Sequence, residues 1–194
     1  MPKQKPEQHT NFPRGVLRLG VACARGIRGD EFLGLGKSDP YAKIIFGSSL
    51  NPQEFKTETD RNAGSNPYWG EWFTMPITVP DITENNNLLI QIYNRNHLRH
   101  DNQIGYCRFL NLGERVMKCE KFATGEVWHP VYDPVTHMPR GEIQLSLRFE
   151  AMGDVEFEKW VTDQVTAHTV QNPPAQASGL GILADVLLTL RVHG

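Results

Sequence analysis

The sequence predicts an all-β fold, an eight-stranded antiparallel β-sandwich. Three observations support this class: short runs rich in β-branched and aromatic residues recur, clusters of Gly, Pro, Asn and Asp separate them, and no long helical period intervenes. The expected strands cover residues 16–24, 41–46, 54–59, 72–79, 88–93, 104–112, 126–131 and 142–149. A chain of 194 residues with 39% hydrophobic content is long enough to bury one core of ordinary size.

The last of these runs alternates strictly, as expected for a strand with one buried face. Its apolar face consists of Ile143, Leu145, Leu147 and Phe149, and its polar face of Gln144, Ser146 and Arg148. The composition changes after Glu150. We therefore expect a flexible N-terminal arm over residues 1–13, the sandwich domain over 14–150 and a C-terminal extension over 151–194.

Within the extension, residues 153–168 fit either a short helix or an extended arm, and residues 171–179 form a Pro- and Gly-containing linker. The apolar segment 180–194 fits both the helical and the strand period. As a helix it would present one apolar face, made of Ile182, Leu183, Val186, Leu187 and Leu190. We expect this face to pack on its own domain or to dock on a partner.

Composition argues against several classes of function. A net charge of −2 and a pI near 6.4 give no overall attraction to nucleic acid. No run approaches the roughly 20 apolar residues that span a bilayer, and residues 1–15 lack the apolar run of a secretory signal. We therefore expect a cytoplasmic protein. Cys23, Cys107 and Cys119 are widely spaced without a CxxC pair, so we interpret them as reduced packing residues.

The sequence also gives little support for catalysis. Its seven histidines lack metal-binding spacing, and no nucleophile elbow is present. The stretch GLGKS at residues 34–38 matches the end of a phosphate-binding loop, but Glu31 stands where that motif needs its first glycine, and Asp39-Pro40 follows where a helix should begin. We predict a protein that is not an enzyme.

Four segments in order carry a family resemblance: GKSDPYAKIIF at 36–46, KTETDRNAGSNPYWGEWF at 56–73, LLIQIYNRNHLRHDNQIG at 88–105 and GEIQLSLRFE at 141–150. Together they resemble the C2 domain of protein kinase C, synaptotagmins and many trafficking proteins. The resemblance covers residues 14 to 150. It implies an eight-stranded sandwich whose loops at one end bind calcium and phospholipid.

The resemblance also implies where calcium would bind, through about five aspartates in two loops. Only one of these is kept, as Asp39, with Leu33 at the first position. The other three aspartate positions hold Asn94, Asn96 and Asn102. An additional acidic position of the family is kept as Asp101. Since calcium affinity depends on charged oxygen ligands, the asparagines indicate a vestigial site or a weak one. The weak alternative would need Asp30 or Glu31 as a replacement for the first aspartate.

Cations and apolar residues stand in these loops instead. Loop 1, residues 25–37, and loop 3, residues 94–102, carry the expected contacts with a membrane or a partner: Arg28, Phe32, Leu33, Leu35, Lys37, Arg95, Leu98 and Arg99. Apolar groups at loop tips gain free energy when an acyl layer covers them, and Lys or Arg adds attraction to acidic lipid. Alternatively, Phe32 and Leu33 pack on loop 3 and the cations only solvate it.

Two classes of function follow from these observations. The first is a calcium-independent or weakly calcium-dependent adaptor that binds acidic phospholipid membranes or protein partners through loops 1 and 3. The second is a scaffolding subunit of a larger assembly, in which the fold serves protein–protein contact. The expected location is cytoplasmic, at a membrane surface or within a cytoskeletal or organelle-associated complex.

Overall fold

The structure is a computed structural model, and it describes residues 14–27, 37–47, 52–77, 88–96, 100–109, 112 and 121–171. Nine strands and one helix lie in this part of the chain. Their bounds are β1 Arg14–Arg25, β2 Pro40–Phe46, β3 Gln53–Lys56, β4 Tyr68–Ile77, β5 Leu88–Asn94, β6 Asn102–Phe109, β7 Lys121–Ala123, β8 Val127–Tyr132, β9 Pro139–Met152 and α3 Asp154–Gln171.

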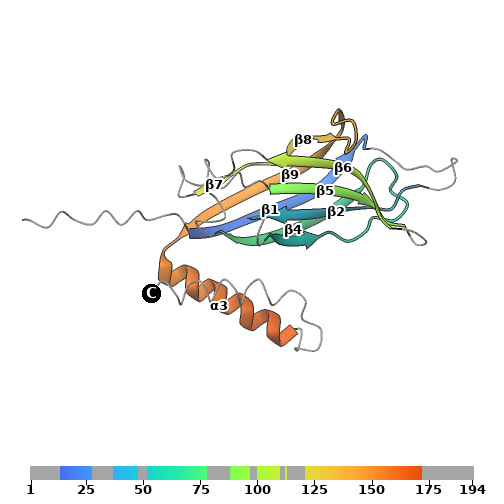
Figure 1. Ribbon diagram of the computed structural model, residues 1–194. Coiled ribbons are helices and arrows are strands. Elements are labelled where there is room, and N and C mark those ends of the chain that lie inside the picture. Colours follow the sequence, from blue (N-terminus) through green and yellow to red (C-terminus); the bar gives the residue numbers. More distant parts are fainter. Residues whose placement is uncertain are drawn as a thin grey trace, which may run out of the picture.

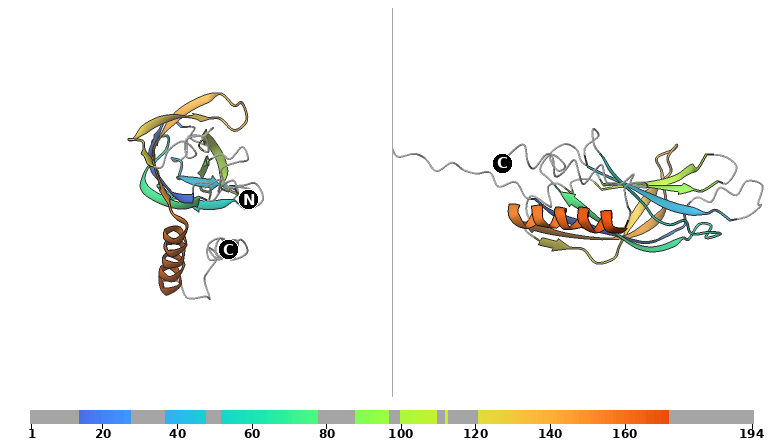
Figure 2. Two further views of the ribbon diagram at one scale, coloured as in Figure 1. Left: turned by 90° about the vertical axis from the view of Figure 1, so that its left-hand side faces the viewer. Right: turned by 90° about the horizontal axis from the view of Figure 1, so that it is seen from below.

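All strand pairs are antiparallel, in the order β3-β2-β5-β6-β8-β9-β1-β4, with β7 added on β9. One bridge, Tyr106 to Tyr132, joins β6 to β8, so the strands form two layers connected at one side. Figure 2 shows them enclosing the core in the end-on view. The predicted sandwich is confirmed. The short strand β7 was not predicted.

The core is apolar and lies between the layers. Strand β9 contributes Ile143, Leu145, Leu147 and Phe149, all at most 2% exposed, which confirms the predicted buried face of this strand. The neighbouring strand β1 adds Leu17 and Leu19, and the opposite layer adds Ile44 from β2 and Ile90 and Ile92 from β5. On the polar face of β9, Ser146 is only 8% exposed. It pairs with Gly20, and the Trp72 ring covers that glycine.

The C-terminal extension begins as a helix, which decides between the two forms expected for residues 153–168. Helix α3 follows β9 directly, at the end of the sandwich from which β1 starts (Figure 1). Its first turn carries Asp154 and Glu156, which suit the positive end of the helix dipole. Asp154 pairs with Arg14 of β1 at 3.4 Å. Phe157 and Val161 are fully buried.

Several sequence predictions fall outside the described residues. These are the N-terminal arm over residues 1–13, Cys119, and the proposed docking face of residues 182–190. The two described cysteines are free thiols, as predicted. Burial raises the pKa of Cys107 to about 12 and, together with Glu126, raises that of Cys23. Cys107 therefore packs in the core as a weak nucleophile, whereas Cys23 is partly exposed and its thiol donates a hydrogen bond to Gln144.

Candidate functional site

Strand registers bring loops from distant parts of the chain to one end of the sandwich. Asn94, the last residue of β5, pairs with Pro40, the first of β2, and with Asn102, the first of β6. The end of loop 1 therefore lies beside both ends of loop 3. On the other layer, Arg25 at the end of β1 pairs with Glu142 near the start of β9. This end of the molecule, hereafter the loop end, is the candidate site.

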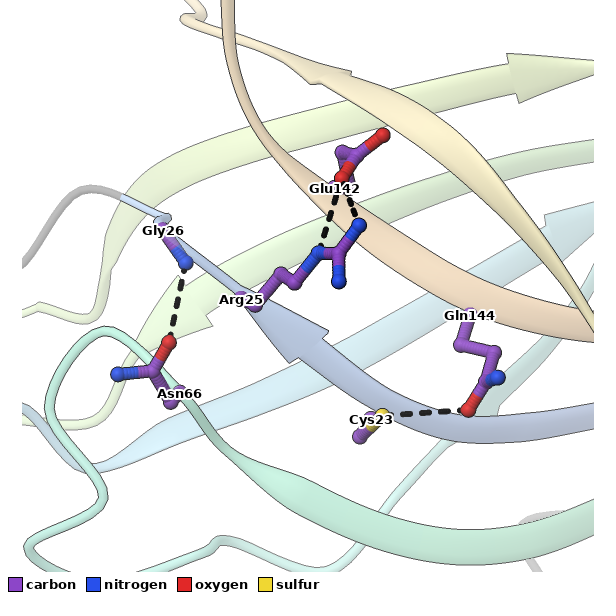
Figure 3. Close-up of polar contacts among 6 residues, drawn as sticks. All are labelled: Cys23, Arg25, Gly26, Asn66, Glu142 and Gln144. Atoms are coloured by element: carbon purple, nitrogen blue, oxygen red, sulfur yellow. Dashed lines mark hydrogen bonds and ion pairs between the residues drawn. The ribbon is translucent and has the colours of Figure 1, made fainter.

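Loop 1 leaves β1 through a fixed set of polar contacts (Figure 3). The Arg25 guanidinium donates two hydrogen bonds to one Glu142 oxygen, at 2.9 and 2.6 Å, and its Cζ lies 4.0 Å from the centre of the Trp128 ring. The Gly26 N–H donates to Oδ1 of Asn66 at 3.2 Å. Arg25 belongs to the cations of loop 1, but its charge is already paired, so it is a structural residue.

The base of loop 1 is held by the side chain of Asn94. Its Oδ1 accepts a hydrogen bond from the backbone N–H of Asp39 at 2.8 Å, and the residue is only 6% exposed. The Asp39 carbonyl accepts from the N–H of Arg95 at 3.0 Å. One Asp39 carboxylate oxygen accepts from the N–H of Asn62 at 2.7 Å. Asn94 and Asp39 therefore join loop 1, loop 3 and the turn after β3.

Asp101 closes loop 3 upon itself and upon β2. One carboxylate oxygen accepts from the Tyr41 hydroxyl at 2.8 Å, and the other accepts from the N–H of Asn96 at 2.9 Å. The Asn96 side-chain amide donates to the carbonyl of His100 at 3.0 Å. Loop 3 therefore has its ends tied together by groups of the protein itself.

Burial of the Asp101 carboxyl disfavours its charged form, but other effects outweigh burial and lower its pKa. The largest of these are the hydrogen bonds from Asn96 and Tyr41, followed by the positive charges of Lys56 and Arg95. The pKa of Tyr41 is raised, chiefly through burial and then through its bond to Asp101. Asp101 thus stays charged and Tyr41 stays a donor at neutral pH.

Tyr41 is fixed on both faces. It stacks on Tyr93 with ring centres 5.5 Å apart, and the Lys56 ammonium lies 3.6 Å from the centre of its ring. The adjacent Pro40 carbonyl accepts from the Trp69 indole N–H at 3.2 Å. Pro40 and Tyr41 of the Ser-Asp-Pro-Tyr segment and Trp69 of the Asn-Pro-x-Trp segment therefore support the bases of loops 1 and 3.

These residues do not fit a calcium ion. Calcium prefers six to eight oxygens, several of them charged, whereas, among the described residues, the positions that the family uses for calcium hold two carboxylates, Asp39 and Asp101. Both carboxylates accept hydrogen bonds from protein groups, as Asn94 does. No group of three His, Cys, Asp or Glu side chains suited to a metal occurs among the described residues. Asp30 and Glu31 lie outside them.

Only some of the contact residues expected from the sequence lie among the described residues. Lys37 and Arg95 are described and exposed, on the rim of the loop end. Asn102 is exposed at the start of β6. The other contact residues proposed from sequence lie outside the described residues, namely Arg28, Phe32, Leu33, Leu35, Leu98 and Arg99.

A third element at the loop end was missed by sequence reasoning. Residues 133–138 connect β8 to β9, and one oxygen of the buried Asp133 accepts the N–H groups of Val135 and Thr136 at 2.9 Å each. Val135 is 77% and Met138 64% exposed. The Asp-Pro pair at 133–134 predicts a turn, but only the register of β8 and β9 places these apolar side chains at the same end of the sandwich as the starts of loops 1 and 3.

The fold is a two-layer antiparallel β-sandwich with loops from both layers at one end. The chain belongs to the C2 domain family, whose profile matches residues 15–130. It is 31% identical over 143 residues to Elicitor-responsive protein 1 of Oryza sativa subsp. japonica, covering 71% of this chain and 85% of that protein. It is 25% identical over 142 residues to the 16 kDa phloem protein 1 of Cucurbita maxima, covering 72% and 90%.

Among solved structures, a C2 domain of plant Extended Synaptotagmin 1 aligns with a TM-score of 0.54 at 20% identity, covering 73% of this chain and 98% of that domain. At this identity the likeness concerns the fold. In the part of the chain that the structure describes, no helix is long and apolar enough to cross a bilayer.

Proposed function

We propose that this chain is a non-enzymatic, calcium-independent adaptor whose loop end contacts acidic phospholipid membranes. The observation that carries the proposal is the use of Asn94 and Asp101 as acceptors for the protein's own donors. In a calcium-dependent loop end, the metal neutralises carboxylates and fixes the loops. Here, backbone N–H groups and the Tyr41 hydroxyl stabilise the loops without an ion.

The surface chemistry of the loop end supports a lipid partner. Val135 and Met138 expose apolar side chains on a turn that its own hydrogen bonds hold in place. Exposed apolar residues on a fixed turn favour burial by a partner, and each such side chain gains about 1.5–3 kcal/mol when fully buried. Lys37 and Arg95 add positive charge, and each cation contributes about 1 kcal/mol near an acidic bilayer surface.

Co-sedimentation with vesicles tests this proposal. Purified full-length protein in chelator should bind vesicles of phosphatidylcholine with phosphatidylserine more strongly than vesicles of phosphatidylcholine alone. The double variant Val135→Asp, Met138→Asp should lower the partition coefficient at least about tenfold, because two apolar contacts become charged. The variant Phe32→Asp, Leu98→Asp tests loops 1 and 3 in the same way.

Val155→Asp is the matched control. This side chain is 83% exposed on α3, away from the loop end, and should leave the partition coefficient unchanged. Equal binding by the loop-end variants and the control would exclude the loop end as the contact. Binding to neither type of vesicle would favour the scaffolding alternative.

A further inference from the structure

A second surface lies on the outer face of strands β4, β1 and β9. Arg18 of β1 stands directly opposite Arg148 of β9, and both side chains are exposed. Like charges in directly opposed positions destabilise a sheet. Among the described residues, no carboxylate lies within ion-pair distance of either guanidinium. The neighbouring Glu150 pairs with Lys121 at 2.8 Å, and the bond and charge of Lys121, followed by the charge of Arg18, lower the pKa of that carboxyl. This arrangement costs stability and leaves two cations available to a ligand.

One exposed aromatic ring lies beside this arginine pair, and a second lies on the same face further along β4. Trp72 is 51% exposed, and its ring rests on Gly20 so closely that a Cβ there would meet three ring atoms at 2.9–3.0 Å. Tyr68 is 70% exposed and covers Gly70 in the same way. Cζ of Arg148 lies 4.9 Å from the centre of the Trp72 ring. The two glycines therefore let both rings lie against the sheet, with Trp72 next to the cations and Tyr68 further along β4.

We propose that Arg18, Arg148, Trp72 and Tyr68 form a docking site for a short acidic segment of a partner protein that also carries an aromatic or apolar side chain. The guanidiniums would bind carboxylates in the bidentate manner that Arg favours. Trp72 and Tyr68 would pack against the apolar group, as aromatic anchors do at protein interfaces.

The surrounding charges favour a short protein segment over a membrane or a nucleic acid. Glu142 and Glu150 stand on β9 at either side of Arg148. Arg25 and Lys121 compensate these two carboxylates, so the arginine pair offers a short stretch of positive charge, which suits a short acidic segment better than an extended polyanion or a flat acidic bilayer. The site is also on the side of the sandwich, whereas the proposed membrane contact is at its end. An adaptor could use both surfaces at once.

Nuclear magnetic resonance on the full-length protein tests the site. The probe is a synthetic peptide, Asp-Glu-Tyr-Asp-Glu with blocked ends, and its control is the amide analogue Asn-Gln-Tyr-Asn-Gln. The acidic peptide should shift the Trp72 indole and the Arg18 and Arg148 resonances in a saturable way, and the analogue should not. Absence of these shifts, or equal shifts by both peptides, would overturn the proposal.

Arg148→Glu separates a ligand-binding role from a structural one. This change places a carboxylate opposite Arg18, so the thermal midpoint should rise by about 1–3 °C, while peptide affinity falls at least tenfold. Arg108→Glu, on the exposed face of β6, is the matched control and should alter neither. A lower thermal midpoint together with a lower peptide affinity would indicate that Arg148 has a structural role, and would contradict the proposed docking site.

Vesicle binding distinguishes this proposal from the membrane function of the loop end. Arg148→Glu should bind acidic vesicles as the wild type does, because the outer face of β9 does not take part in that contact. If acidic vesicles shift the Trp72 indole and the change weakens vesicle binding, the surface is a membrane face and the protein-docking proposal is wrong.

Discussion

Replacing Asn94, Asn96 and Asn102 together by Asp is expected to make the stability of the protein depend on calcium. The new carboxylates would join Asp39 and Asp101 at the loop end, giving the several charged oxygens that calcium prefers. Without metal, their mutual repulsion should lower the thermal midpoint of the variant. Saturating calcium should then raise it, because a ligand at 100 times its dissociation constant adds about 2.7 kcal/mol to stability, or about 5–10 °C for a chain of this size.

Differential scanning calorimetry in calcium, in magnesium and in chelator measures this effect. The wild type should show one midpoint in all three conditions. Magnesium serves as the control for the variant, because it demands a tighter octahedral site and keeps its water ligands. A calcium-induced shift in the wild type, or none in the triple variant, would contradict our assignment of the three asparagines.

Replacing Asp101 by Ala should lower the free energy of unfolding by about 2–4 kcal/mol. The change leaves the Tyr41 hydroxyl and the N–H of Asn96 without their charged acceptor, and hydrogen bonds to charged groups contribute about 1.5–3 kcal/mol each. We take less than the sum because the Asp101 side chain is partly exposed. Urea denaturation of the variant and the wild type at neutral pH gives the difference directly.

The same residue sets a pH dependence with a defined sign. The folded pKa of Asp101 is below its ordinary value of 3.8, so its stabilising effect is present above that value and disappears as pH falls through the folded pKa. The stability difference between wild type and Asp101→Asn should therefore shrink below about pH 4. A difference that stays constant down to pH 2 would mean that the charge of Asp101 contributes nothing.

Much of the fold could be predicted from the sequence because its signals are local. The alternation from Ile143 to Phe149 identifies a strand and its buried face, and breaker residues mark the intervals between strands. Strand ends were less accurate: β9 extends to Met152, and β4 starts at Tyr68, four residues before the predicted run. The extra residues of β4 pair next to a bulge in β1, and nothing in the local sequence of β4 records that bulge.

The candidate site could be predicted only in part, because its contacts join residues far apart in the chain. The family resemblance identified Asn94 and Asp101 as positions at the loop end, but not their partners, since the Tyr41 hydroxyl and the Asp39 N–H come from another strand and the loop before it. Trp72 and Arg148 meet only through the register of three strands. Such contacts depend on pairing, which a single sequence does not specify.

The most direct test of the central claim is sedimentation of the wild-type protein with phosphatidylserine-containing vesicles, once in calcium and once in chelator. A loop end held by Asn94 and Asp101 predicts the same bound fraction in both conditions, decreasing as salt screens Lys37 and Arg95. Binding that appears only when calcium is present would contradict the account.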